Sequence, residues 1–551
     1  MICAEDCAPP SASRCRPLSP TPLPALRASA MCSVAVSSAS NFMGSMWGKS
    51  EGKAEPVSAG HRGCECSRAN IAAMLKPLQP LRVPAACAAL CLSLFSPLKA
   101  QDLPAEVDAA LRRAKLPETA LVAVVHEVGS GSQKLAWRER EPVNPASVFK
   151  LVTTYAALDQ WGPAWSWRTP VWVQGTVKDG VLEGKLIIKG SGDPSLVLER
   201  VWLMLRRVQQ MGIREIRGDV LLDRSFFNLP VVSPKAFDDD ASQPYNVRPD
   251  ALMMNFKAVT YTFTPDPSRG VALVQTDPAL AGVRTDETVP LAAVACDDWS
   301  AQLKPQWGEP KHMNFAGRYP QSCGERSFSM AYADPASFNA RMVEAMWQQL
   351  GGRLSGQVKD SVLPPGARLL FDQVSPPLQQ VVRDINKFSN NVMAEQVFLS
   401  LGQVDKPSGG ITPDDAREQV RRFLASRLGE DGLKGWVVDN GSGLSRETRL
   451  TAQGLSRLLQ QAWSSPVMAE LMSSLPISGV DGTLRRSKAP QGRAHLKTGS
   501  LRDVAAVAGY VLSNSGRRYV VVAILNHPNA AAGRPAFDAL VQWAIRDAPS
   551  R

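Results

Sequence analysis

The residues in this sequence best suited to chemistry are a serine and a lysine three positions apart, Ser147 and Lys150. Residues at this spacing share one face of a helix, so the amine can lie within hydrogen-bond reach of the hydroxyl. A serine becomes nucleophilic when a base takes its proton, and a lysine can be that base when burial or a neighbouring positive charge lowers its pKa. The pair therefore predicts nucleophilic attack by Ser147. The same S-x-x-K spacing occurs at Ser50 and Ser96, however, so it is a weak signal alone.

Two further motifs lie downstream and combine hydroxyl, amide and ammonium groups. An S-x-N motif falls at a break between two helical segments. A K-T-G motif lies in a strand-like run, where a strand edge can bind a peptide by main-chain pairing while the ammonium attracts a carboxylate. Each tripeptide alone could equally be a helix cap or an exposed lysine before a turn, but their order and separate contexts predict one shared site. The residues are Ser389, Asn391, Lys497, Thr498 and Gly499, with Ser500 following the glycine.

The segments around these motifs follow helical and strand-like patterns of apolar residues. A helix and strands at the front of the chain, with antiparallel strands and a helix at its end, predict one split α/β domain closed around an insertion. Asn144 and Pro145 are suited to begin the helix that carries Lys150. Between 168 and 366 the sequence pattern changes to short strand-like runs separated by Pro, Asp and Gly, which predicts an inserted β-rich region. The expected helices are 104–116, 149–158, 201–210, 378–385, 393–401 and 535–545, and the expected strands are 120–128, 135–137, 171–173, 186–189, 220–222, 494–498, 504–512 and 519–525.

In this order, the three motifs resemble the signature of the serine penicillin-recognising enzymes, which are the D-Ala-D-Ala peptidases and the serine β-lactamases. The long stretch between Ser147 and Ser389, together with G-S-G-D-P at 190–194 and D-N-G-S-G-L-S-R at 439–446, is similar to the penicillin-binding protein 4 type of D-alanyl-D-alanine carboxypeptidase/endopeptidase. The resemblance covers essentially all of residues 101–551. It implies a serine β-lactamase/DD-peptidase-like domain, an antiparallel sheet with flanking helices, split by the β-rich insertion.

The resemblance also implies roles for the matching catalytic residues. Ser147 would be the acylated nucleophile and Lys150 its general base. Ser389 and Asn391 would relay protons and hold the substrate amide. Lys497 would steer a terminal carboxylate and help keep Lys150 neutral by like-charge repulsion.

Substrate-binding roles follow from the same resemblance. Thr498 would supply a hydroxyl contact, and the backbone N–H groups of Ser147 and Ser500 would form an oxyanion hole, typically worth about 3 to 4 kcal/mol per donor. Arg446 would bind an acidic group on a stem-peptide side chain, and Asp240 would hold the amino group of a diamino acid. The alternative for Asp240 is a solvated acidic run, and Arg502 stands where related enzymes often carry an uncharged residue.

Composition and cysteine usage indicate an exported globular protein. The 551 residues are 44% hydrophobic and carry a net charge of +11 without a basic run, so no nucleic-acid partner is expected. Cys296 and Cys323 are the two cysteines beyond the first hundred residues, and in an oxidising compartment they predict a disulfide worth about 3 to 4 kcal/mol, with two buried free thiols as the alternative.

The first hundred residues are predicted to contain a targeting segment rather than a folded domain. Residues 74–100 have a basic start, an apolar stretch too short to span a bilayer and a small residue at Ala100, which predicts a cleaved signal peptide and a periplasmic protein. Residues 1–73 are interpreted as a disordered upstream extension, with a small module using Cys64 and Cys66 as metal ligands as the alternative. The expected domain parts are 101–167 and 367–551 for the peptidase and 168–366 for the insertion.

Other chemistries are weighed against these expectations. The sequence lacks H-E-x-x-H, paired C-x-x-C and P-loop patterns, so no metal or cofactor is expected. His495 lies near Lys497, but strand packing is the expected role for it. A rapid β-lactamase is disfavoured by the large insertion and by the lack of a Glu-containing deacylation motif, and a non-catalytic cell-wall or β-lactam sensor by the intact motifs. The expected partners are peptidoglycan stem peptides and, as covalent inhibitors, β-lactams; the patterns do not predict an oligomeric state.

Overall fold

The structure is a computed structural model that describes residues 102–309 and 311–547. The predicted extension at 1–73, the predicted signal peptide at 74–100 and the cysteines proposed as metal ligands there lie outside the described residues. Within those two described ranges, no helix combines the length and apolarity needed to cross a bilayer.

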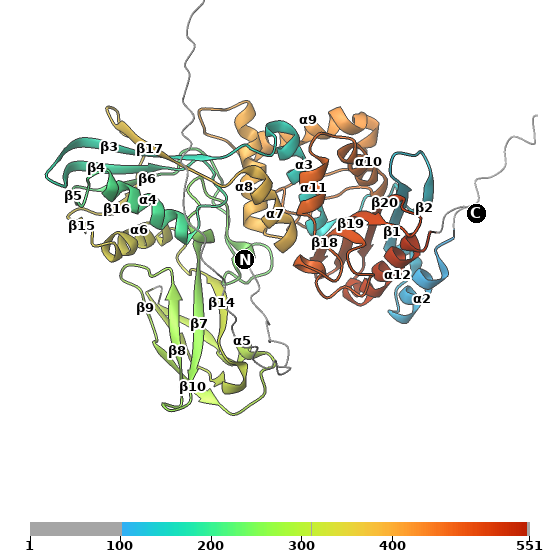
Figure 1. Cartoon of the computed structure of the whole chain (residues 1–551), viewed down its shortest axis with the longest axis horizontal. Helices are drawn as coiled ribbons and strands as arrows, with labels where there is room; N and C mark the ends of the chain where they lie inside the picture. The colour runs from blue at the N-terminus through green and yellow to red at the C-terminus, as the bar shows by residue number, and fades with distance from the viewer. Residues whose placement is uncertain (1–101, 310, 548–551) are drawn as a thin grey trace, which may run out of the picture. The chain divides into compact units, whose positions relative to one another are not determined.

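A five-stranded antiparallel sheet joins the two ends of the described chain (Figure 1). Its strand order is β18-β19-β20-β1-β2, so the first two strands of the chain pair with the last three. β18 lies at one edge of this sheet. The sheet therefore closes the split domain from both sides of the sequence. The strands are β1 (Leu121–Glu127), β2 (Gln133–Trp137), β18 (Ala494–Leu501), β19 (Val504–Leu512) and β20 (Arg518–Asn526).

Helices cover both faces of this sheet. Successive side chains of a strand point to opposite faces, and β1 shows this directly, because Val122 and Val124 join one apolar core whereas Leu121, Ala123 and Val125 join another. The first core is shared with α3 (Lys150–Trp161), α7 (Leu378–Phe388), α8 (Asn391–Leu401), α9 (Pro413–Gly432), α10 (Ala452–Trp463) and α11 (Met468–Ser474). The second core is shared with α2 (Ala105–Arg113) and α12 (Arg534–Ile545).

The inserted segment forms three further sheets around a core of its own. A seven-stranded sheet contains β3 (Arg168–Lys178), β4 (Val181–Lys189), β5 (Glu215–Arg217), β6 (Val220–Asp223), β15 (Arg353–Leu354), β16 (Val358–Asp360) and β17 (Arg368–Val374). A five-stranded sheet contains β7 (Ala258–Asp266), β8 (Val271–Asp277), β10 (Thr288–Ala292), β13 (Tyr319–Pro320) and β14 (Arg326–Ala331), and a three-stranded sheet contains β9 (Arg284–Thr285), β11 (Pro305–Glu309) and β12 (His312–Phe315). The helices of the insertion are α4 (Leu198–Gln210), α5 (Trp299–Gln302) and α6 (Phe338–Gln349).

The end of the insertion lies later in the chain than the sequence indicated. β17 pairs antiparallel with β3, so it belongs to the seven-stranded sheet of the insertion. The expected boundary at 366 therefore moves to the end of β17, at Val374. The loop at 363–367 has the Pro and Gly content of a domain boundary, but the strand after it returns to the inserted sheet.

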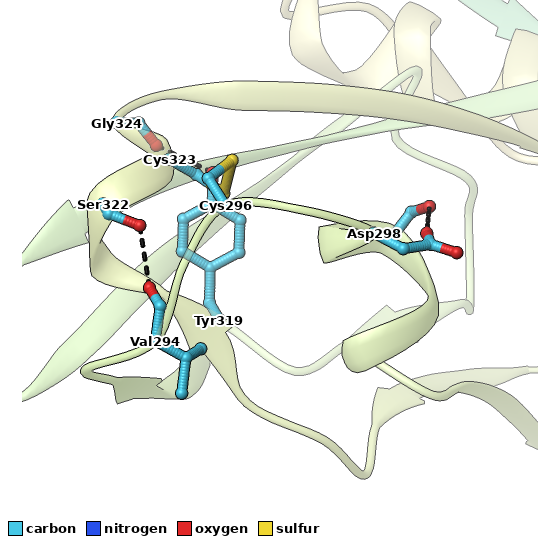
Figure 2. Close-up of a disulfide and its surroundings, with 8 residues drawn as sticks. Val294, Cys296, Asp298, Tyr319, Ser322, Cys323 and Gly324 are labelled. Carbon is cyan, nitrogen blue, oxygen red and sulfur yellow. Dashed lines mark hydrogen bonds between the residues drawn. A yellow bond between two sulfur atoms is a disulfide. The ribbon is translucent and has the colours of Figure 1, made fainter.

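A disulfide joins Cys296 and Cys323 (Figure 2). It links the loop after β10 to the turn before β14, and the alternative of two free thiols does not hold. Two hydrogen bonds order the same loops: Ser322 Oγ donates to the Val294 carbonyl at 2.8 Å, and Tyr319 Oη donates to the Gly324 carbonyl at 2.7 Å. The bridge thus ties together the two ends of the segment between β10 and β14, within the insertion.

Replacing both cysteines by serine is expected to destabilise the insertion. Cross-linking residues 27 apart restricts the unfolded chain, so the double variant should lose about 3 kcal/mol of unfolding free energy. Denaturant titration of the oxidised parent and the variant measures the difference, and reduction of the parent should reproduce it. Equal midpoints for parent and variant would contradict the prediction.

Candidate active site

The turn that carries Ser147 is tighter than the helix that follows it. Residues Ala146–Phe149 form a 3₁₀ turn and α3 begins at Lys150, whereas the sequence indicated a helix from Pro145. The N-cap of this turn is Pro145 rather than Asn144, and the Asn144 Oδ1 accepts the Ala146 N–H at 2.9 Å from one position earlier. In a 3₁₀ turn residues i and i+3 eclipse each other, and Lys150 Nζ lies 3.0 Å from Ser147 Oγ.

The hydrogen bonds of Lys150 define what its amine can do. Nζ donates to Asn391 Oδ1 at 2.6 Å and to the Ser442 carbonyl at 2.6 Å. Both oxygens only accept, so they occupy the two N–H groups of a neutral amine. The third contact is the Ser147 hydroxyl, which can donate to the remaining lone pair. This arrangement suits a neutral Lys150 that takes the proton of Ser147.

Electrostatics favour the neutral form of that amine. Lys150 is fully buried, and burial, assisted by the positive charge of Lys497 and opposed by Glu395, lowers the pKa of Lys150 well below its usual range. Lys497 is also fully buried, and burial lowers the pKa of Lys497 to about 7. Ser147 is the one residue of 143–150 that is not buried, so the nucleophile is accessible while its base is not.

The S-x-N motif forms the junction between α7 and α8. Ser389 ends α7 in the left-handed conformation (φ 57°, ψ 35°), which is rare for a residue other than glycine, and such strain is concentrated at functional sites. Asn390 caps α8 by accepting the Met393 N–H at 3.0 Å. The junction brings Ser389 Oγ within 2.8 Å of Lys497 Nζ, and Asn391 to Lys150.

The K-T-G motif lies on the edge strand β18. The N–H of Leu496 points off this edge, since it donates to the Pro476 carbonyl at 2.9 Å. Backbone groups alternate along a strand, so those of Thr498 and Ser500 point the same way, and the Thr498 carbonyl indeed accepts from Lys497 Nζ at 2.8 Å. The N–H of Ser500 therefore projects from the open edge.

Two glycines allow neighbouring segments to pack closely against the backbone beside Ser147. A Cβ on Gly499 would lie 2.7 Å from the Pro145 carbonyl and 3.2 Å from the Ser147 nitrogen. A Cβ on Gly443, which also has φ +76°, would lie 2.0 Å from the Ala146 carbonyl. Gly499 thus lets the strand that carries Ser500 approach the Ser147 nitrogen closely, and Ser147 donates no backbone hydrogen bond within 102–309 and 311–547.

A cavity of about 400 Å³ opens over these groups. Its walls come from the peptidase motifs and from the loop of the insertion that precedes residue 246. The lining residues include Ser147, Ser389, Asn391, Ser500, Arg502, Asp238 and Phe237. The structure therefore brings together the three motifs that the sequence placed far apart.

The two residues expected to recognise a substrate side chain, Arg446 and Asp240, already have partners within the protein. Arg446 pairs with Asp503 at 2.8 Å and lies over the Phe237 ring at 4.8 Å from its centroid. Asp240 is not among the cavity residues, because its carboxylate accepts hydrogen bonds from Ser242 and Gln243 nearby in the chain. In place of Asp240, Asp238 lines the cavity, and its carboxylate also accepts hydrogen bonds, from Tyr245 Oη at 2.9 Å and from Asn246 Nδ2 at 2.6 Å.

The side chains of the K-T-G-S run are used mainly within the protein. Thr498 Oγ1 donates to Thr483 Oγ1 at 2.7 Å, and Ser500 Oγ accepts from Arg534 at 2.8 Å. His495 is partly buried, and burial lowers the pKa of its imidazole. No described hydrogen bond joins His495 to Lys497.

Two residues at the site were not anticipated from the sequence. Ser442 supplies the carbonyl that Lys150 contacts, and Glu395 accepts the Ser442 hydroxyl at 3.0 Å. Glu395 follows Asn391 by four positions on α8, so the two share a helix face. That spacing was the available signal, but it acquires meaning only once Asn391 is known to contact Lys150.

Comparison with known proteins agrees with this geometry. A model of the D-Ala-D-Ala carboxypeptidase 3 (S13) family matches residues 103–547. The D-alanyl-D-alanine carboxypeptidase of an Actinomadura species is 28% identical over 470 residues, covering 80% of this chain and 84% of the relative. D-alanyl-D-alanine carboxypeptidase DacB of Haemophilus influenzae is 24% identical over 426 residues, covering 75% of this chain and 86% of the relative.

The same fold is present in a solved structure. The crystal structure of penicillin binding protein 4 from Haemophilus influenzae matches with a TM-score of 0.62 at 21% identity, covering 79% of this chain and 99% of that chain. The predicted fold class and the resemblance stated from the motifs are thereby confirmed. The chain belongs to the D-Ala-D-Ala carboxypeptidase 3 (S13) family and is a serine-type carboxypeptidase, a hydrolase.

Proposed function

We propose that Ser147 attacks the carbonyl of the penultimate D-alanine of a peptidoglycan stem peptide and that Lys150 takes its proton. The carbon–nitrogen bond breaks, and the leaving amine, a terminal D-alanine or a cross-linking amine, departs with a proton supplied through Ser389 or Lys150. Water then hydrolyses the ester to restore Ser147 and release the peptide acid. The observation that carries this proposal is the contact of a fully buried lysine amine with the Ser147 hydroxyl.

The open edge of β18 supplies the rest of the binding geometry. The N–H groups of Ser147 and Ser500 would hold the developing oxyanion, and the Ser500 carbonyl would accept an N–H of the substrate backbone. Asn391 uses Oδ1 on Lys150, which leaves its Nδ2 to donate to a substrate carbonyl. Lys497 would attract the terminal carboxylate, with the Thr498 hydroxyl beside it.

The wall formed by the insertion would recognise the stem-peptide side chain. Arg446 lines a neighbouring cavity of about 350 Å³ together with Phe237, where it is suited to bind an acidic group, although such a group must compete with Asp503. Asp238, rather than Asp240, would hold an amino group, because Asp238 lines the cavity over Ser147. These assignments favour a diamino acid that carries both charges. We also place the enzyme in the periplasm, on the evidence of the signal-like segment at 74–100.

The pH dependence of substrate binding tests the role of Lys497. The pKa of Lys497 is about 7, so its positive charge is present below that pH and is lost as the pH rises above it. The ratio of kcat/KM for a D-Ala-D-Ala peptide to that for the same peptide amidated at its C-terminus should fall roughly tenfold per unit above about pH 8. The ratio cancels effects on Lys150, and a ratio that stays constant would argue against carboxylate binding by Lys497.

Product analysis separates the proposal from its two competitors. The purified protein is incubated with a labelled penicillin and the adduct is located by peptide mass, and D-alanine release from a stem peptide is measured in parallel. A stable adduct on Ser147 with D-alanine release supports the peptidase. Rapid turnover of penicillin would indicate a β-lactamase, and an adduct without D-alanine release a sensor. An adduct on another residue would overturn the assignment of the nucleophile.

A further inference from the structure

Glu395 is a buried carboxylate that the acyl-transfer scheme does not use. Its side chain lies on α8 one turn after Asn391, and the residue is 6% exposed. Residues four apart on a helix occupy the same face. Asn391 contacts Lys150 directly, and Glu395 lies near enough to act on the charge of the same amine.

The contact between Glu395 and Lys150 runs through one residue, Ser442. The Ser442 hydroxyl lies 3.0 Å from Glu395 Oε1, and the Ser442 carbonyl accepts from Lys150 Nζ at 2.6 Å. Ser442 is fully buried, and its N–H donates to Asn440 Oδ1 at 3.1 Å. The hydroxyl also lies 3.1 Å from Asn440 Oδ1, a second acceptor, and accepts the Leu444 N–H at 3.1 Å. The backbone N–H and the side-chain hydroxyl of Ser442 are thus both hydrogen-bonded, while its carbonyl faces Lys150.

We propose that Glu395 is a positioning residue for acyl transfer: it holds Ser442 so that the Ser442 carbonyl aims the lone pair of Lys150 at Ser147, and its negative charge favours the protonated form of Lys150. The inference rests on the function proposed above, since it assumes that Lys150 is the base. No described hydrogen bond joins Glu395 to Ser147 or to Lys150.

The charged groups around Glu395 and Lys150 determine whether Glu395 raises or lowers the pKa of Lys150. Glu395 faces Lys150 of α3, Arg248 of the insertion loop and Asp439 of the loop before Ser442, and Lys150 also faces Lys497 of β18. Burial raises the pKa of Glu395 to about 7. As the pH rises through that value, Glu395 gains its charge and stabilises the proton on Lys150. Removing this charge should therefore leave Lys150 neutral at a lower pH.

Two substitutions separate the charge of Glu395 from its hydrogen bond. Glu395→Gln keeps an oxygen for the Ser442 hydroxyl and removes the charge, whereas Glu395→Asp keeps a charge and draws the carboxylate away from Ser442. The rate of penicillin acylation is measured between about pH 5 and about pH 9. We expect Glu395→Gln to shift the low-pH decline of the acylation rate down by about one pH unit. Its maximal acylation rate, the plateau, should stay within about threefold of the parental rate. Glu395→Asp should keep the low-pH decline in place and lower the plateau about tenfold.

Three further measurements make the result decisive. Ser442→Ala should lower the plateau as Glu395→Asp does. Glu418→Gln, which removes an exposed carboxylate paired with Arg422 on α9, should reproduce the parent profile. Thermal unfolding reports whether each variant folds, and if the Glu395 variants do not fold, Ser442→Ala alone decides.

The outcomes distinguish this inference from the proposed function. Absence of acylation in the parent protein would contradict the proposed function itself. Acylation in the parent with a Glu395→Gln profile that superimposes on it, or with a Ser442→Ala plateau equal to that of the parent, overturns only the positioning role.

Discussion

Replacing Ser147 by alanine is expected to abolish covalent labelling by penicillin while leaving the protein folded. The alanine variant has no hydroxyl to acylate, so adduct formation should disappear and D-alanine release should fall by roughly 10⁴-fold or more. Ser147 is partly accessible, and its described side-chain contact is with Lys150, so its loss opens no cavity in the apolar core. Intact-protein mass after incubation with penicillin measures the adduct directly.

A matched serine provides the control for this experiment. Ser473 is exposed on α11, where its hydroxyl donates to the Glu470 carbonyl at 3.2 Å. Ser473→Ala should label at the parental rate and stoichiometry. Full labelling of Ser147→Ala would show that another residue is the nucleophile.

The second large effect is expected at Lys150. Replacing it by glutamine retains N–H donors but removes the group that takes the proton of Ser147, so the acylation rate should fall by about 10³-fold to about 10⁴-fold. In the parent, burial lowers the pKa of Lys150, and acylation should decline as the pH falls and the amine gains a proton. Stopped-flow acylation across the pH range measures both effects.

Lys150→Arg distinguishes a base from a positive charge. Arginine keeps the charge and the donors but remains protonated at any pH that the protein tolerates. If Lys150 acts as the base, the arginine variant should be as slow as the glutamine variant. Acylation by the arginine variant within about tenfold of the parent would instead indicate that the charge, not the lone pair, is what Ser147 needs.

The fold around the motifs was predictable because its signals are local. The apolar runs at 504–512 and 519–525 correspond to β19 and β20, and the break between the expected helices at 378–385 and 393–401 corresponds to the junction that holds Ser389. Two helices not identified from the sequence, α9 and α10, also carried local signals. Thr412 and Asp415 form a capping box at the start of α9, and Thr451 caps α10.

The insertion was less predictable for a physical reason. Its core joins side chains from strands far apart in the chain, among them Val173, Tyr261 and Phe371, and its strands are short and interrupted by turns. Pairings such as β17 with β3 depend on that shared core rather than on local pattern, which is why the boundary at 366 was placed too early.

The site residues also divide into those that local sequence signals predict and those whose roles depend on the tertiary fold. The spacing of Ser147 and Lys150 is a property of one turn, whereas the role of Ser442 depends on a loop folding back onto that turn. Asp240 shows the reverse case, because an acidic run matched an expected function but its carboxylate is bound by Ser242 and Gln243. Arg446 pairs with Asp503, a partner that the sequence did not indicate, and it is not among the residues that line the cavity over Ser147.

The edge strand β18 also bears on how this protein behaves at high concentration. Residues 476–478 run antiparallel to its first half, with Ile477 opposite His495 and the Ser478 N–H bonded to the Ala494 carbonyl. The unprotected stretch is therefore limited to the few backbone groups from Thr498 onward. That length accommodates a dipeptide, but it offers a neighbouring molecule too short a template for sheet-to-sheet aggregation. The segment at 476–478 thus shortens the part of the sheet edge to which a second strand could add.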